Sequence, residues 1–226
     1  MSDTNAAAPF LARLRGMLDN RPAYRPGERC ELCGAAIGEP HAHLVNLESR
    51  SLLCVCRPCY LLFDHAGVTH GKFRAVGESY RHASEVTLGD ALWERLQIPV
   101  DVAFFFVNSS LGRTVAFYPS PAGATESLLA LDTWGELVAA NPTLAGLVPD
   151  VQALLVRRRA ALSEPSRFEC HLVPIDACYE LVGRMRRLWK GFSGGEEVWR
   201  EIEGFFAELR RRGGADDSQP AASVAS

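Results

Sequence analysis

Two C-x2-C pairs near the start of the chain constrain its fold more than any other feature of the sequence. Cys30 and Cys33 form the first pair, Cys56 and Cys59 form the second, and 22 residues separate the two pairs. Thiolates at this spacing converge on one tetrahedral metal ion without strain. The pattern therefore predicts a Zn²⁺ site. Because four sulfurs leave no coordination position open, we expect that site to be structural.

Iron is the alternative metal for these four cysteines. Four thiolates also hold a single iron of the rubredoxin type or an iron–sulfur cluster. Rubredoxin knuckles usually place a glycine after each cysteine pair. Here Gly34 follows the first pair, but Tyr60 follows the second. We therefore expect zinc, and an iron-binding electron-transfer protein is the second interpretation.

Composition and charge disfavour several classes of protein. The net charge of −3 argues against sequence-independent capture of nucleic acid. No stretch approaches the roughly 20 apolar residues that a membrane-spanning helix needs. The first residues lack the basic and apolar segments of a secretory signal. The seven cysteines are an odd number and fit a disulfide framework poorly. We therefore expect a cytoplasmic protein whose paired cysteines hold metal.

Turn-forming residues and shifts in composition divide the sequence into four parts. Residues 1–27 are predicted to be partly disordered, with a short amphipathic helix. Residues 28–76 contain both cysteine pairs and form the predicted zinc-binding module. Residues 77–212 form a larger α+β domain. Residues 213–226 are rich in small and polar residues, and we expect them to be disordered.

Short apolar runs predict the fold of the module. Residues 43–48 and 51–55 have the pattern of two strands in a hairpin that leads into the second cysteine pair. The apolar residues after Cys59 favour a helix beside the metal site. A hairpin followed by a helix, with a cysteine pair at each end, is the treble-clef arrangement, whereas a zinc ribbon has strands in place of the helix. We therefore predict a treble-clef-like module.

The larger domain is predicted to mix strands with helices and to end in two helices. The run 102–107 is apolar throughout, so its strand should be buried on both faces of a sheet. Thr133 with Glu136, and Ser193 with Glu196, form capping boxes that predict helix starts. The expected strands are 102–107, 114–119, 151–156 and 168–173. The expected helices are 89–96, 133–141 and two C-terminal helices with apolar faces over 178–189 and 198–209.

Three residues between the cysteine pairs are alternative metal ligands or redox groups. Cys54 lies two residues before Cys56 and would face the same side of an extended strand. His41 and His43 form an H-x-H motif whose members would also share one face. The two histidines could replace a cysteine at the first metal or form a second site. For Cys54, a small buried side chain is the simpler interpretation.

Cys170, His171 and Cys178 are the candidates for catalysis in the larger domain. A Cys–His pair makes a nucleophile when the imidazole lowers the pKa of the thiol. Adjacent residues on a strand point to opposite faces, so Cys170 and His171 should not meet. Cys178 falls on an apolar helix face. We therefore assign no catalytic residue, and an enzyme of the larger domain is the third interpretation.

Two polar segments are candidates for a surface that binds a partner or ligand. The loop PSPAGATE at 119–126 is dense in turn formers and carries Ser120, Thr125 and Glu126. A basic group on the first C-terminal helix lies away from its apolar face and suits an acidic partner. Its members are Arg184, Arg186, Arg187 and Lys190. A plain turn and a solvated helix face are the simpler interpretations.

With these motifs in view, the sequence resembles an uncharacterised bacterial family, a domain of unknown function whose genes often lie in nickel–iron hydrogenase operons. The resemblance covers about residues 28–210. It is carried by the segments at 30–63, 98–106, 117–127 and 174–195. It supplies no catalytic residues. What it implies is a cytoplasmic accessory protein that helps to build or serve a hydrogenase.

The leading hypothesis is therefore a non-enzymatic, zinc-stabilised accessory protein that binds a protein partner. The resemblance implies that this partner is a hydrogenase subunit or maturation factor.

Overall fold

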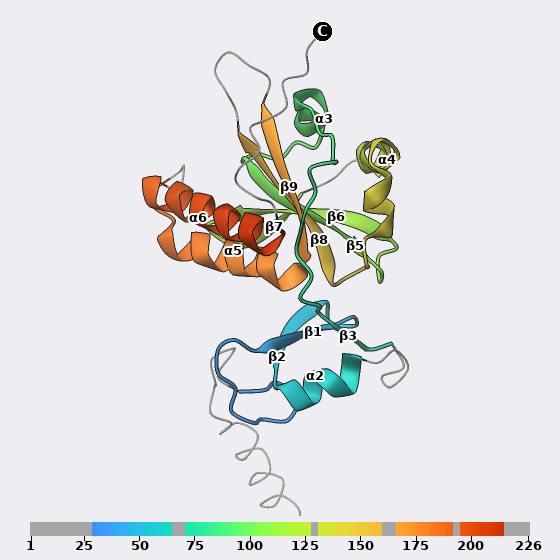
Figure 1. Cartoon of the computed structure of the whole chain (residues 1–226), viewed down its shortest axis with the longest axis vertical. Helices are drawn as coiled ribbons and strands as arrows, with labels where there is room; N and C mark the ends of the chain where they lie inside the picture. The colour runs from blue at the N-terminus through green and yellow to red at the C-terminus, as the bar shows by residue number, and fades with distance from the viewer. Residues whose placement is uncertain (1–28, 65–70, 128–130, 160–165, 192–194, 215–226) are drawn as a thin grey trace, which may run out of the picture.

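The computed structural model describes residues 29–64, 71–127, 131–159, 166–191 and 195–214. Within them the chain has an α+β fold, with a small unit that carries the cysteine pairs beside a larger one (Figure 1). The predicted helix and disorder before residue 28, and most of the predicted disordered tail, lie outside these residues. Among the described helices, none is long and apolar enough to cross a membrane.

The small unit, called the cysteine module below, is a three-stranded antiparallel sheet with one helix against it. Its strand order is β2-β1-β3. The elements are β1 (Ala42–Asn46), β2 (Ser51–Val55), α2 (Arg57–Asp64) and β3 (Phe73–Ala75). The order of cysteine pair, hairpin, cysteine pair and helix is the treble-clef-like order predicted from the sequence. The third strand was not predicted, because three residues carry no readable alternation.

The larger domain is built on a six-stranded antiparallel sheet with the order β4-β9-β8-β5-β6-β7. Its strands are β4 (Arg81–His82), β5 (Val102–Asn108), β6 (Arg113–Ser120), β7 (Gly123–Ser127), β8 (Gln152–Arg159) and β9 (Arg167–Pro174). Its helices are α3 (Asp90–Arg95), α4 (Leu131–Ala140), the 3-10 helix η1 (Pro142–Gly146), α5 (Ile175–Leu188) and α6 (Glu196–Arg212). The two C-terminal helices, α5 and α6, were predicted from the sequence, and they are the last elements of the domain.

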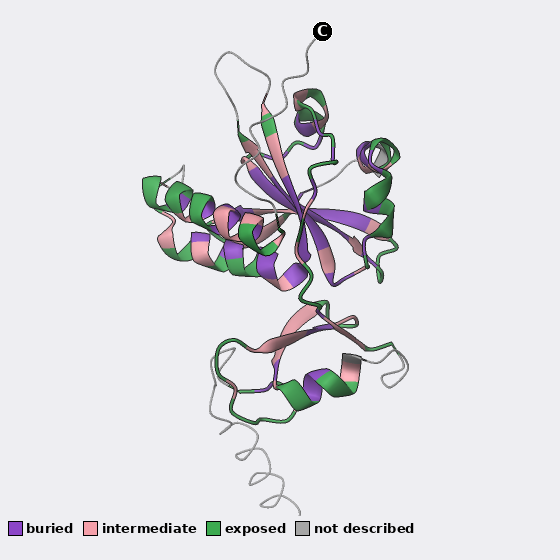
Figure 2. Ribbon diagram, in the orientation of Figure 1, coloured by how far each residue is buried: buried purple, intermediate pink, exposed green. Residues whose placement is uncertain are grey.

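Helices cover both faces of this sheet (Figures 1 and 2). Phe104 belongs to the core cluster that includes α5 and α6, and its ring meets Tyr179 edge-on at 5.8 Å. Phe105 belongs to the cluster on the opposite face, where it stacks on Trp134 of α4 at 5.6 Å. Residues 102–106 are all buried, as the apolar run predicts. Burial on two faces explains why this strand shows no polar alternation.

The cysteine module packs against the larger domain through the outer face of β1 and through β3. Val45 and Val76 join the core cluster of α5, α6 and the large sheet. From β3, the Arg74 guanidinium donates to the Pro149 carbonyl at 2.7 Å and to the Asp150 carboxylate at 3.1 Å. Asp150 is buried, so this ion pair is shielded from solvent on one side. Strand β1 therefore contributes side chains both to the core of the cysteine module and to the core of the larger domain.

The segment PSPAGATE is not a loop throughout its length, which corrects the sequence interpretation. Residues 123–127 form the edge strand β7, which pairs with β6 in the register Ser120↔Gly123 and Tyr118↔Thr125. Only the turn around Pro121 joins the two strands. The sequence obscured β7 because its residues are small or polar, a composition that strand propensity disfavours and that an edge position tolerates.

Both predicted capping boxes are wrong. Thr133 lies inside α4, whose described part already begins at Leu131. Helix α6 begins at Glu196 with Gly195 at the N-cap, so Glu196 occupies the first turn and cannot close a box from the third position. Ser193 itself lies outside the described residues. The acids at the start of α6 and the arginines at its end match the helix dipole.

Candidate functional site

The four cysteines of the two pairs come together in the cysteine module. Their sulfur atoms all lie within 4.8 Å of one another, and the Sγ atoms of Cys33 and Cys56 are 3.6 Å apart. A zinc–sulfur bond of about 2.3 Å makes the edge of a tetrahedron of sulfurs about 3.8 Å long. The sulfurs are therefore spaced to hold one metal ion with four thiolates.

The first cysteine pair sits in a tight turn that its backbone closes. The Gly34 amide donates to the Cys30 carbonyl at 2.8 Å, and the Cys30 amide donates to the Ala35 carbonyl at 2.8 Å. Gly34 has φ of 75°, a conformation that L side chains rarely adopt, and this explains glycine at that position. The turn aims both sulfurs of the pair to one side.

The second pair sits at the start of a helix. Cys56 directly precedes α2, and Cys59 lies in its first turn, where the Tyr60 amide donates to the Cys56 carbonyl at 2.9 Å. Pro58 is tolerated there because the first amides of a helix have no intrahelical acceptor. The partial positive charge at this end of the helix favours thiolates.

The pKa values of the thiols favour a bound cation at the cluster. Burial opposes a charge on Cys30, but three backbone amides, that of Cys56 first, outweigh it and lower its pKa to about 6. Burial and the neighbouring sulfurs raise the pKa of Cys59 far above its ordinary value. The thiolate form of Cys30 is therefore favoured, and its negative charge opposes ionisation of Cys59. A bound metal ion removes this repulsion, since it takes all four thiolates.

The hydrophobic core of the module is small. Its buried members are Cys30, Leu44, Val55, Cys59 and Tyr60, and two of these are the proposed ligands. Units of this size usually need a metal, a disulfide or a partner to stay folded. The metal is therefore expected to be part of the module core.

His41, His43 and Cys54 form a second cluster in the module. Their potential ligand atoms also lie within 4.8 Å of one another. His43 pairs directly with Cys54 across the β1–β2 hairpin, and His41 lies two residues before His43, next to the start of β1. The two rings are 4.8 Å apart between centroids. The histidines are thus grouped with Cys54 and not with the four cysteines.

The three catalytic candidates of the larger domain do not come together as a nucleophile and base. Cys170 belongs to the core cluster under α3 and α4, whereas the buried His171 ring meets Phe206 of α6 on the other face. Burial raises the pKa of Cys170 to about 12 and that of Cys178 well above its ordinary value. Neither thiol is poised to form a thiolate. His171 instead contacts Glu169 at 3.1 Å.

The polar residues of the β6–β7 hairpin have different surroundings. The Ser120 hydroxyl donates to the Gly123 carbonyl at 3.1 Å and lies 2.8 Å from the Thr125 hydroxyl. Both hydroxyls therefore contribute to the turn. Glu126 projects from β7 toward a cleft and forms an ion pair with Arg113 at 3.0 Å. Their role as a partner surface stays a prediction.

The basic group on α5 is divided between internal ion pairs and solvent. Arg184 forms ion pairs with Glu180 at 2.5 Å and with Glu201 of α6 at 3.1 Å. Lys190 forms an ion pair at 2.7 Å with Glu197. The two remaining members, Arg186 and Arg187, are exposed. Their role toward a partner also stays a prediction.

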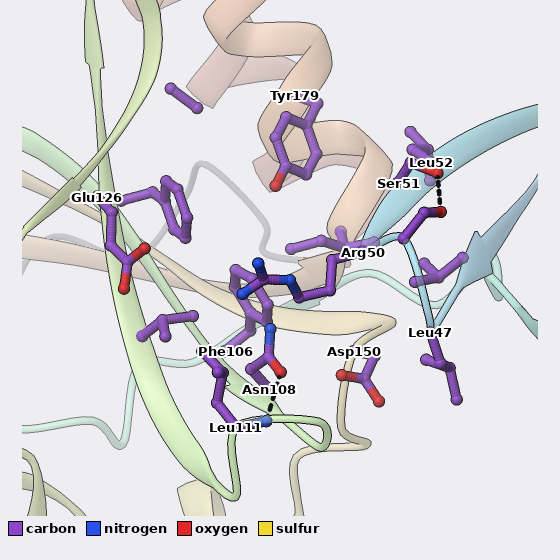
Figure 3. Close-up of a pocket in the computed structure, with 16 residues that line it drawn as sticks. Leu47, Arg50, Ser51, Leu52, Phe106, Asn108, Leu111, Glu126, Asp150 and Tyr179 are labelled. Carbon is purple, nitrogen blue, oxygen red and sulfur yellow. Dashed lines mark hydrogen bonds between the residues drawn. The ribbon is translucent and has the colours of Figure 1, made fainter.

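A cleft of about 600 Å³ lies between the cysteine module and the larger domain, and the sequence analysis did not predict it. Arg50, from the β1–β2 turn, extends into it above Phe106 and Asn108 of β5, while Tyr179 of α5 closes the opposite side (Figure 3). Its walls come from segments far apart in the chain, so no local pattern marks them. The one local signal was the Ser-Arg-Ser turn between the two module strands.

None of the ion pairs formed among the described residues uses Arg50, although Asp150 and Glu126 also line the cleft. Arg50 itself is exposed and has φ of 55°. The cleft thus combines apolar walls with a cation whose guanidinium is available to a ligand. This is the usual make-up of a binding site, in which few polar groups fix the orientation of a ligand held by apolar contact.

The fold and the cysteines define an α+β protein with a four-cysteine candidate metal centre. The chain matches the family of unknown function (DUF5947) over residues 29–213, and it belongs to that family. The match spans the cysteine module and the larger domain together. None of the curated proteins matches the chain, and no solved structure matches it.

Replacing Cys59 by alanine should remove at least one equivalent of bound transition metal per chain, because the remaining three sulfurs cannot close the cage. Metal content of the gel-filtered variant, measured by elemental analysis against the wild-type protein, tests this. Cys170→Ala is the matched control, since it removes a thiol in the larger domain and should keep the wild-type metal content. Equal metal content in the Cys59→Ala variant and the wild type would contradict the site.

Proposed function

We propose that the protein is a non-enzymatic, zinc-stabilised accessory protein of the cytoplasm that binds a protein partner in the cleft between its two units. The cleft carries the proposal, because both the cysteine module and the larger domain contribute to it. The metal would then act on binding indirectly, by holding the β1–β2 turn and its Arg50 in place.

Zinc is the metal that the surroundings of the cysteines favour. Gly34 gives the first pair the turn expected of a rubredoxin knuckle, but the second pair continues into helix α2. Tyr60 follows that pair, is buried, and donates its hydroxyl proton to the Val76 carbonyl at 3.1 Å. A knuckle followed by a helix is the treble-clef design, in which zinc is the usual ion.

Iron in an electron-transfer protein is the second candidate, and one observation favours it. Cys33 is exposed, so the metal would lie close to the surface, where electrons reach a partner over a short path. The two metals are distinguished by colour, because ferric iron held by thiolates absorbs visible light and zinc does not.

The protein purified without added metal should contain zinc and be colourless. Elemental analysis together with a visible absorption spectrum makes this measurement, and purification without immobilised nickel avoids metal exchange. Iron in near-stoichiometric amount with visible absorption would contradict the zinc assignment and make electron transfer the leading function.

The cleft is suited to a segment of a protein partner that carries apolar and acidic side chains. Phe106, Phe117 and Tyr179 offer aromatic surface, and Arg50 offers a guanidinium that can bind a carboxylate through two hydrogen bonds. The volume of about 600 Å³ accommodates a few side chains. A stable protein–protein interface needs more contact area than this cleft provides. The neighbouring strand β7 lies at the edge of the six-stranded sheet and can add area by pairing with a strand of the partner.

The partner that we propose is a subunit or maturation factor of a nickel–iron hydrogenase. The support for this choice is the resemblance of the sequence to a family whose genes often lie in hydrogenase operons. The chemistry of the larger domain supports a binding role, since burial raises the pKa values of its two cysteines and leaves neither as an activated nucleophile.

Arg50→Glu should weaken the complex about tenfold, because it reverses the charge that the cleft presents to an acidic segment. The measurement is the amount of hydrogenase subunit or maturation factor that co-purifies with the tagged full-length protein from its native host. Arg167→Glu makes the same change at an exposed position of β9 and should leave the yield unchanged.

A double variant separates the two candidate surfaces. Arg186→Glu with Arg187→Glu changes the exposed part of the α5 basic group and should retain the partner if the cleft is the binding site. Loss of the partner in that variant, with retention in Arg50→Glu, would move the binding site to α5. A wild-type protein that recovers no hydrogenase-associated protein would contradict the proposal.

A further inference from the structure

The cluster of His41, His43 and Cys54 has the features of a second metal site, separate from the four cysteines. Two imidazoles and one thiolate converge with their ligand atoms within 4.8 Å of one another. The cluster lies on the face of the β1–β2 hairpin that is turned toward the larger domain, because His43 reaches α5. Imidazole and thiolate are together the ligands that zinc and copper prefer.

Both histidines form their hydrogen bonds through Nδ1, which leaves Nε2 of each ring available to a metal ion. His43 contacts the Asp176 carboxylate through Nδ1 at 2.8 Å, so in the neutral ring Nδ1 carries the proton and Nε2 has the lone pair. His41 contacts the Gly38 carbonyl through Nδ1 at 3.2 Å, and a carbonyl also requires a proton on its partner. Metal-binding histidines almost always donate their second N–H to a carboxylate or a carbonyl in this way.

The Nε2 atom of His41 is buried and makes no hydrogen bond with any described residue. A buried ring nitrogen without a partner forfeits the free energy of hydration that it has in water. With the proton on Nδ1 this atom is an acceptor, and a metal ion is a ligand that satisfies it. The atom points into the same cluster as Cys54 and His43.

Asp176 is itself held in place for its role toward His43. Its Oδ1 atom accepts a hydrogen bond from the Ala177 amide at 2.8 Å, which leaves Oδ2 for the histidine. The residue lies in the first turn of α5, where the helix dipole favours a carboxylate. The carboxylate comes from the larger domain and lies 133 residues from His43 in the sequence.

The dimensions of the cluster suit a tetrahedral ion after small side-chain movements. Bonds of about 2.05 Å to nitrogen and 2.3 Å to sulfur place tetrahedral ligand atoms about 3.4 to 3.6 Å apart. The ligand atoms here lie within 4.8 Å, so rotation of the rings and of the Cys54 side chain closes the remaining distance. The strand register that places His43 opposite Cys54 does not need to change.

We propose that His41, His43 and Cys54 bind a second transition-metal ion, with Asp176 as the residue that positions His43. Three protein ligands leave a fourth coordination position for water or for a group supplied by a partner, as in zinc sites that exchange ligands. The four-cysteine site is closed, whereas this second site is open. Zinc is the ion expected at the second site, and copper is the competing ion.

The backbone of Cys54 connects this site to the four-cysteine site. Glu31, which lies between the cysteines of the first pair, accepts a hydrogen bond from the Cys54 amide at 2.6 Å and donates its own amide to the Cys54 carbonyl at 2.9 Å. Metal in the four-cysteine site therefore orders Cys54, and loss of that site should also empty the second one. The reverse does not hold, because no ligand of the first site depends on the histidines.

Metal stoichiometry tests this proposal on the full-length protein. The wild-type chain, equilibrated with excess zinc and freed of unbound metal, should hold two equivalents, and the double variant His41→Ala with Cys54→Ala should hold one. The retained equivalent in the double variant shows that its cysteine module is folded. His82→Ala removes a histidine from the larger domain and should keep both equivalents. Repeating the titration with copper distinguishes the two ions.

A second variant tests the role of Asp176 without removing a ligand. Asp176→Ala should lower the affinity for the second metal ion about 10- to 100-fold and leave the affinity for the first ion unchanged. Competition with a chelator measures both affinities. This measurement also tests the proposal if the double variant misfolds and therefore loses both metal ions. An unchanged second affinity in Asp176→Ala would then overturn the proposal.

Two further results would overturn the proposal. One is a wild-type chain that binds a single equivalent at saturation, and the other is a second equivalent that survives in the double variant. Neither result bears on the partner or on the four-cysteine site, so failure here is distinct from failure of the proposed function.

Discussion

The convergence of four cysteine sulfurs is the main constraint on the cysteine module and on the elements that the module positions. Among the described residues, the core of the module around them has five buried members, and two of those are the cysteines Cys30 and Cys59. A core of this size contributes little apolar stabilisation to the hairpin and the helix. The four sulfurs lie close enough together to bind a metal ion. Because the binding free energy of a structural metal is also folding free energy, we expect metal binding to stabilise the module.

Strand β1 connects the core of the cysteine module to the core of the larger domain. Leu44 faces the module core, and the next residue, Val45, belongs to the core of α5, α6 and the large sheet. Alternation along one strand thus joins the two cores. The same strand positions His43 against Asp176, and its following turn carries Arg50 into the cleft. The cleft and the cluster of His41, His43 and Cys54 are therefore both expected to depend on the four-cysteine site.

The sequence predicted what local patterns encode. Cysteine spacing located the module, the apolar run at 102–107 identified a strand buried on both faces, and apolar spacing identified α5 and α6. Contacts between distant segments were not predictable. No local pattern links His43 to Asp176, or places Arg50 and Tyr179 in one cleft, because both arrangements follow from how the two units pack. The capping boxes were wrong because Thr133 already lies inside α4 and because Gly195 is the N-cap of α6.

Amide hydrogen exchange of the full-length protein, before and after removal of its metal by a chelator, tests most directly whether the metal holds the module. If the metal holds the module, the amides of β1, β2 and α2 should lose their protection when the metal leaves. Those of β5, β8 and β9, at the centre of the large sheet, should stay protected. Unchanged protection of β1, β2 and α2 in protein shown to be free of metal would contradict this prediction.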